Sequence, residues 1–95
     1  MNREEYVAKL KGQLDQWNAE VTKWEAKSKE AQAGMRADAE KQLEAFRRQR
    51  DQALEEMRKV QNASGDAWQD LMRGAEGAWK NLKEAFERAS SHFNK

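Results

Sequence analysis

Large apolar residues recur along the chain at helical spacing. In the first third they follow one another at alternating steps of four and three, and smaller or softer residues continue the series. The members are Leu10, Leu14, Trp17, Val21, Trp24, Ser28, Ala31 and Met35. Because such steps keep side chains on one stripe of a helix, this heptad predicts a coiled-coil seam.

A repeat of eleven residues organises the remainder of the chain. One row consists of Trp24, Met35, Phe46, Met57, Trp68 and Trp79, and a second consists of Val60, Leu71, Leu82 and Phe93. Eleven residues turn an α-helix by about 1100°, only about 20° past three full turns. A heptad favours left-handed supercoiling, whereas an 11-residue repeat favours the right hand. The pattern therefore predicts helix throughout, with a change of supercoil near Met35.

The best helix-breaking signal is the sequence NASGD at residues 62–66. It offers polar turn residues followed by Ser64 or Asp66, either of which can cap the next helix. We expect a long helix over residues 3–61, a break over 62–66 and a second helix over 66–92. Two alternatives stay open. The 11-residue rows cross 62–66 in phase, as in a kinked continuous helix, and a second break near Gly34 would give a monomeric three-helix hairpin.

The predicted fold class is all-α, with residues 1–95 forming a single helical domain. A long coiled-coil helix is followed by a shorter amphipathic helix, and self-association completes the hairpin or bundle. The long helix would extend roughly 85–90 Å, so the second helix covers less than half of its apolar stripe. A homo-oligomer is the simplest way to bury the rest. The predicted assembly residues are Leu10, Leu14, Trp17, Val21, Trp24, Met35, Leu43, Phe46, Leu54, Met57 and Val60.

The second helix carries a broad apolar face. The residues predicted to dock it on the long helix, or to contact lipid, are Trp68, Leu71, Trp79, Leu82 and Phe86. Amphipathic helices with such faces can lie in a membrane interface. Basic and acidic residues are balanced in this segment, which weakens attraction to anionic lipid. A lipid-surface protein that folds on membranes is therefore the alternative to a self-associating interaction protein.

Composition narrows the class of protein. The 95 residues carry a formal net charge of +1 and include neither cysteine nor proline. Without cysteine, disulfides and thiolate metal sites are excluded. The near-balanced charge gives no reason to expect a nucleic-acid partner. Leu, Ile, Val and Phe together supply only 12 residues, which leaves open a chain that folds conditionally on a partner.

Candidate chemistry is sparse. The one histidine, His92, follows Ser90 and Ser91 near the C-terminus, where a frayed helix end supplies no rigid pocket for a Ser–His pair. A Glu-x-x-His metal motif is absent, because Ala89 stands three residues before the histidine. We therefore predict no enzyme, no cofactor and no metal site.

The densest basic cluster has the sequence RRQR at residues 47–50. It is interpreted as a solvated helix face with acidic neighbours, and a contact with phosphate or an acidic partner is the less favoured alternative. No apolar run near the start matches a secretory signal, and no window approaches the roughly 18 apolar residues of a membrane span. A cytoplasmic location is the resulting expectation.

Two blocks of sequence resemble a known family. Residues 3–11 (REEYVAKLK) and 14–18 (LDQWN), together with 63–71 (ASGDAWQDL) and 74–83 (GAEGAWKNLK), are similar to short bacterial coiled-coil proteins often labelled stress-response proteins. The resemblance spans most of the chain. It implies a soluble, cytoplasmic bacterial protein with no catalytic residues to transfer. The stress label describes a circumstance and supplies no mechanism, and the role expected for the chain is structural or protective. The 11-residue rows resemble, less closely, desiccation proteins of the late-embryogenesis type.

Overall fold

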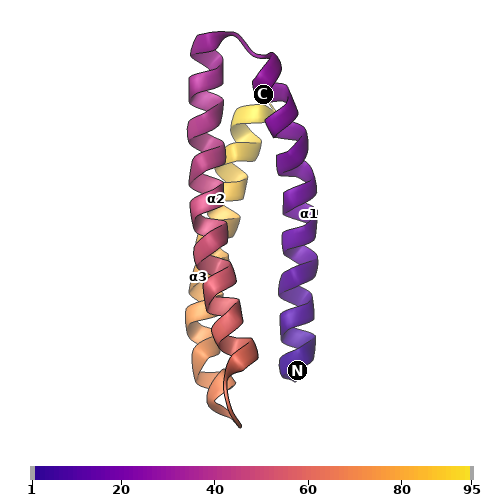
Figure 1. The fold of residues 1–95 in the computed structure, drawn as a ribbon, viewed down its shortest axis with the longest axis vertical. Coiled ribbons are helices and arrows are strands. Elements are labelled where there is room, and N and C mark those ends of the chain that lie inside the picture. The colour runs from indigo at the N-terminus through magenta and orange to yellow at the C-terminus, as the bar shows by residue number, and fades with distance from the viewer. Residues whose placement is uncertain (1, 95) are drawn as a thin grey trace.

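Three antiparallel helices form an up-down-up bundle in the computed structural model, which describes residues 2–94 (Figure 1). They are α1 (Arg3–Glu30), α2 (Ala33–Asn62) and α3 (Ala67–Phe93). The bundle is a rod with extents of 52 × 18 × 17 Å. The all-α prediction is confirmed. The second helix agrees with its predicted bounds to within one residue at each end.

The long helix predicted over residues 3–61 is wrong. The chain turns back at Ala31 and Gln32, so that the three-helix alternative is the one observed. The break falls two residues before Gly34, which lies in the first turn of α2. The physical reason is tertiary: folding back lets the apolar stripe of α1 bury itself against α2 and α3 of the same chain.

The α1–α2 turn is made by ordinary backbone conformations. Ala31 and Gln32 are both extended, with φ values of −77° and −64° and ψ values of 156°. Gln32 is the N-cap of α2, but its side chain makes no capping hydrogen bond, and the first turn of α2 contains no acidic residue. The Arg36 guanidinium instead donates to the carbonyls of Lys29 and Ala31, at 3.2 and 3.1 Å. This arginine therefore satisfies carbonyls at the end of α1.

The α2–α3 turn is specified locally. It spans residues 63–66, which confirms the predicted break over 62–66 and excludes a kinked continuous helix. Gly65 has a φ of 55°, the only positive φ in the described part of the chain. Glycine adopts this left-handed conformation without the steric cost that a Cβ brings. The Arg3 guanidinium donates to the Ala63 carbonyl, so the start of α1 is held beside this turn.

The three helices are not equally spaced. α2 and α3 make the closest contact, and α1 lies farther from both. Figure 1 shows α1 standing apart from the other two helices. Both helices carry completely buried alanines, including Ala53 of α2 and Ala75 of α3. A Cβ built on Gly74 would lie 2.7 Å from Glu56 Oε2 of α2, so the glycine leaves room for that carboxylate. Small residues thus hold α2 and α3 together as a tight hairpin.

Candidate functional site

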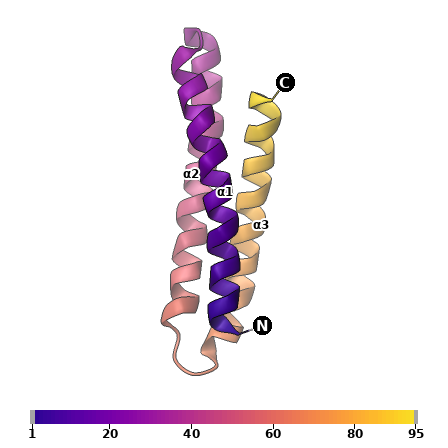
Figure 2. The same ribbon diagram turned by 90° about the vertical axis from the view of Figure 1, so that its right-hand side faces the viewer.

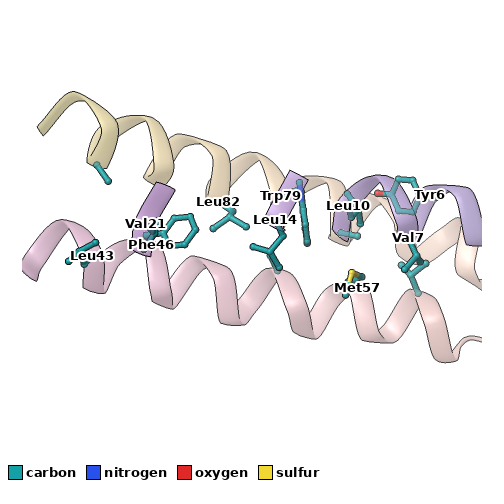
Figure 3. Close-up of a cluster of buried hydrophobic side chains, with 14 of the residues drawn as sticks. Tyr6, Val7, Leu10, Leu14, Val21, Leu43, Phe46, Met57, Trp79 and Leu82 are labelled. Atoms are coloured by element: carbon teal, nitrogen blue, oxygen red, sulfur yellow. The ribbon is translucent and has the colours of Figure 1, made fainter. Parts of the chain in front are cut away.

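Most of the predicted assembly residues lie inside the single chain (Figure 3). Those that are buried are Leu10, Leu14, Val21, Trp24, Leu43, Phe46, Met57 and Val60. Trp17 and Leu54 are half-buried against this core, whereas Met35 is 66% exposed. The closed bundle therefore presents no free seam along α1 and α2. Assembly through these residues stays a prediction, and it requires either the uncovered Met35 or an opening of the bundle.

The residues predicted for the second helix pack within the same chain. Trp79 and Leu82 are buried, and Trp68, Leu71 and Phe86 are half-buried against the core. In the closed bundle α1 and α2 cover most of this apolar face of α3. Contact of the same face with lipid would require α1 to move away.

An aromatic layer joins α1 to α3. Its members are Trp17, Trp24, Trp79, Phe86 and Phe93. The Trp24 ring centroid lies 5.1 Å from that of Phe86 and 5.4 Å from that of Phe93. Trp17 continues the layer, 5.6 Å from Phe86 and 6.4 Å from Trp79. These bulky rings fill the wider spacing between α1 and α3. Offset or tilted ring pairs of this kind stabilise a fold by more than the burial of their apolar area alone.

Two polar atoms in this seam have no hydrogen-bond partner among the described residues. They are the hydroxyl of Tyr6 and Nε1 of Trp79, and both side chains are buried (Figure 3). Burial raises the pKa of Tyr6, and the carboxylate of Glu76 raises it further. An unpaired buried donor costs roughly 1–3 kcal/mol. The seam between α1 and α3 therefore carries a polar penalty that opening would relieve.

A shallow groove lies over the same seam. Its volume is about 430 Å³. The lining residues are Tyr6, Lys9, Leu10, Gln13, Trp17, Glu76, Trp79, Lys80 and Lys83. Three lysines and one glutamate surround an aromatic floor. This combination suits an amphiphile with a negatively charged head group.

The bundle has an open end at the α1–α2 turn. Among the described residues α3 ends at Phe93, short of that turn, so only its last residues reach the end of α1 and the start of α2 (Figures 1 and 2). A hollow of about 440 Å³ lies there, lined by Lys27, Ser28, Ala31, Met35, Asp38, Ala39, His92 and Phe93. Met35 is the one large apolar side chain that is exposed in the described part of the chain. We refer to this hollow and its lining residues as the open end.

Polar contacts tie α1 to α2 beside the open end. The hydroxyl of Ser28 donates to Glu40 Oε1 at 3.2 Å, and Ser28 is 1% exposed. Arg47 bridges the two helices, with Nη2 3.2 Å from Glu25 Oε2 and Nη1 3.7 Å from Glu40 Oε2. Sequence reasoning did not find this network. The only available signal was the position of Ser28 in the heptad series, because partners 12 and 22 residues apart follow from the turn that was missed.

The other candidate residues have structural partners. Arg47 of the basic cluster pairs with the glutamates named above, and Arg50 Nε lies 3.8 Å from Asp51 Oδ1. His92 lies in the last turn of α3, where its ring meets Phe93 edge to face at 5.0 Å. The neighbouring Ser90 hydroxyl accepts from the Asn94 amide at 3.0 Å.

Comparison with known proteins adds no relative. No family model, curated protein or solved structure matches the chain. Within residues 2–94, no group of three or more His, Cys, Asp or Glu side chains is placed to hold a metal ion. Across the same residues, none of the helices combines the length and apolarity that crossing a bilayer requires.

Proposed function

We propose that this protein is a non-enzymatic helical interaction protein that self-associates. The observation that carries the proposal is the position of Met35. It is exposed at the open end, yet it stands eleven residues from both Trp24 and Phe46, which are buried. Within the described residues, Met35 is thus the one large apolar member of the stripe that is exposed to solvent. A second copy that supplied apolar contact there would complete the stripe.

The size of the open end limits how two closed bundles could associate. A stable dimer buries about 800 Å² on each partner, which one methionine and its neighbours do not provide. Closed bundles touching at this end would therefore form only a weak complex. A tight dimer needs apolar surface that the closed bundle keeps inside.

Self-association is tested by sedimentation velocity from about 1 μM to about 500 μM, where mass action shifts a monomer–dimer equilibrium. We expect a dimer whose fraction rises with concentration. Met35→Glu should weaken it, because a charge would enter the apolar contact. Ala45→Glu places the same charge at another exposed position on α2 and serves as the matched control. A chain that sediments as a monomer over the whole range contradicts the proposal.

A protective role in stress, in the cytoplasm of a bacterium, is part of the proposal. It rests on the resemblance of residues 3–18 and 63–83 to the short bacterial coiled-coil proteins. A helical protein that opens can cover exposed apolar surface on a damaged partner. Light scattering from a heat-denatured client enzyme should therefore rise more slowly when the protein is added. Scattering equal to that with an inert helical protein of the same size would remove the protective role.

A lipid surface is the second candidate partner. The unpaired Tyr6 hydroxyl and Trp79 Nε1 favour it, because at a membrane interface aromatic rings bury their apolar body while polar atoms reach water. Flotation with vesicles of phosphatidylcholine, with and without phosphatidylglycerol, tests it. Lys80→Glu should reduce binding to the anionic vesicles, whereas Lys41→Glu, on the exposed face of α2, should not. Absence of flotation with both vesicles would exclude this partner.

A further inference from the structure

We propose that the self-associated form is a domain-swapped dimer. In it α1 and α2 become one continuous helix over residues 3–62, and each α1 packs on the α2–α3 hairpin of the second copy. This inference rests on the self-association proposed above and specifies its geometry. The occupant of the apolar surface under α1 is then the α1 of a second copy.

Local sequence does not encode the α1–α2 turn. The α2–α3 turn has Gly65 with its positive φ, whereas Ala31 and Gln32 have no residue-specific conformation to enforce reversal. Alanine and glutamine are good helix formers. The α2 N-terminus also has no side-chain cap. Short connections without a locally enforced turn are where exchange between copies occurs at low cost.

The buried stripes of α1 and α2 are in phase with each other. The core positions of α1 end at Trp24 and Ser28, and those of α2 begin at Ala39 and Leu43. Inserting Ala31 and Met35 produces the unbroken series 24, 28, 31, 35, 39, 43, 46, with steps of three or four throughout. In a continuous helix all these residues would share one face. Two helices that pack only as a hairpin do not require their buried stripes to fall on one face of a continuous helix.

A swapped dimer also buries Met35. Two straightened helices would run antiparallel, and their central segments would lie side by side across a two-fold axis. An isologous contact places equivalent residues of both copies near that axis. Met35 and Ala31 of each copy would then meet their counterparts at the centre. The residue that the closed bundle leaves exposed becomes part of the new interface.

The contacts that hold α1 on the hairpin can be remade between copies, apart from the Arg36 bonds at the turn itself. The Arg3 bond to the Ala63 carbonyl, the Ser28 bond to Glu40 and the aromatic layer all join α1 to α2 or α3. None of these depends on α1 belonging to the same chain as its hairpin. The balance between monomer and dimer is therefore decided at the α1–α2 turn and by concentration.

Proline at position 32 separates the two forms. Gln32 has a φ of −64°, which matches the proline ring, and Ala31 has the extended conformation that a residue before proline prefers. Among the described residues, the Gln32 N–H donates to no backbone carbonyl. The closed monomer therefore accepts Gln32→Pro. A continuous helix does not, because proline in its interior removes a hydrogen bond and clashes with the preceding turn.

The first measurement is the dimer dissociation constant by sedimentation. We expect Gln32→Pro to raise it by at least about 100-fold, given the helix-interior cost of proline in both chains. Gln32→Ala is the matched control and should leave it unchanged or lower it. Equal dissociation constants for the proline and alanine variants would overturn the swap.

The second measurement is a distance within one chain. The chain has no cysteine, so Ala8→Cys and Arg58→Cys, both at exposed positions, can carry a pair of spin labels. In the closed bundle the two positions lie on adjacent antiparallel helices, less than about 30 Å apart including the labels. In a continuous helix, fifty residues separate them by about 75 Å. Doubly labelled chains diluted into excess unlabelled protein report only this intrachain distance.

The outcomes distinguish the two proposals. A dimer with the long distance, abolished by Gln32→Pro, supports the swap. A dimer whose intrachain distance stays short leaves self-association standing and overturns the swap. A chain that is monomeric at every concentration overturns both.

Discussion

The rings of Trp24 and Phe93 lie almost parallel, with centroids 5.4 Å apart and an interplanar angle of 2°. This pair links the latter part of α1 to the last turn of α3. Trp24 also contacts Phe86, so that one residue of α1 meets two rings of α3. The attachment of α1 to the hairpin is therefore concentrated in a few aromatic side chains.

Trp24→Ala should strongly destabilise the fold. Trp24 is 2% exposed, and replacing a buried tryptophan by alanine costs about 3–5 kcal/mol because the cavity collapses only in part. Trp68→Ala makes the same chemical change at a half-buried site in the first turns of α3, where we expect a loss of about 1 kcal/mol. Urea denaturation followed by circular dichroism gives both values. Equal losses in the free energy of unfolding would show that Trp24 in the aromatic layer contributes no more to stability than the half-buried Trp68.

Gly77→Ala should stabilise α3. A Cβ at this position meets no atom within 4 Å, and alanine is favoured over glycine in a helix by about 0.5–1 kcal/mol. Gly74→Ala is the matched comparison on the same helix. Its Cβ would displace the Glu56 carboxylate, which also pairs with Lys59 at 3.2 Å, so its gain should be smaller. Thermal unfolding of both variants ranks them, and a larger gain for Gly74→Ala would contradict the close approach of α2 and α3.

Tyr6→Phe should stabilise the protein and change its response to alkali. Removing an unpaired buried hydroxyl relieves a penalty of roughly 1 kcal/mol at neutral pH. In the wild type the folded pKa of Tyr6 is raised, so above about pH 10 the unfolded chain ionises first and stability falls. Below that pH this contribution is constant. Urea unfolding at about pH 8 and about pH 10.5 should show a smaller alkaline loss for the variant; a larger loss would refute the assignment.

Arg36→Gln should increase the dimer fraction. Two hydrogen bonds from this guanidinium to α1 carbonyls exist only while the chain is turned at residues 31 and 32. In a continuous helix those carbonyls accept backbone N–H groups instead. Losing two exposed bonds should raise the association constant by about fivefold. Lys41→Gln makes the same charge change elsewhere on α2, and sedimentation that finds the two variants alike would speak against the role of Arg36.

The sequence pattern was sufficient for the helices and for one of the two turns. NASGD at 62–66 contains a glycine whose left-handed conformation ends helical continuity, so the α2–α3 turn is encoded where it occurs. The 11-residue rows also mark the core. Of their ten members six are buried, three are half-buried and only Met35 is exposed. The sequence alone predicts the structure wherever one residue type determines the local backbone conformation.

The turn at Ala31 and Gln32 could not be predicted in the same way. Its residues favour helix, and the apolar steps run through it without a change of phase. What ends α1 is the gain from packing Trp17 and Trp24 against α3, together with the capping by Arg36. These are contacts between segments far apart in the chain. The same tertiary origin explains why the bridge from Arg47 to Glu25 was not expected from the sequence.

The order of synthesis gives the aromatic layer a further consequence. α1 leaves the ribosome before α3, so Phe86 and Phe93, the rings on which Trp24 packs, are made only after α1 is complete. At about 5–20 residues per second, a finished α1 waits on the order of ten seconds for its own α3. On a crowded polysome the completed hairpin of a neighbouring chain is available sooner. The share of exchanged dimers should therefore depend on how fast and how densely the protein is translated.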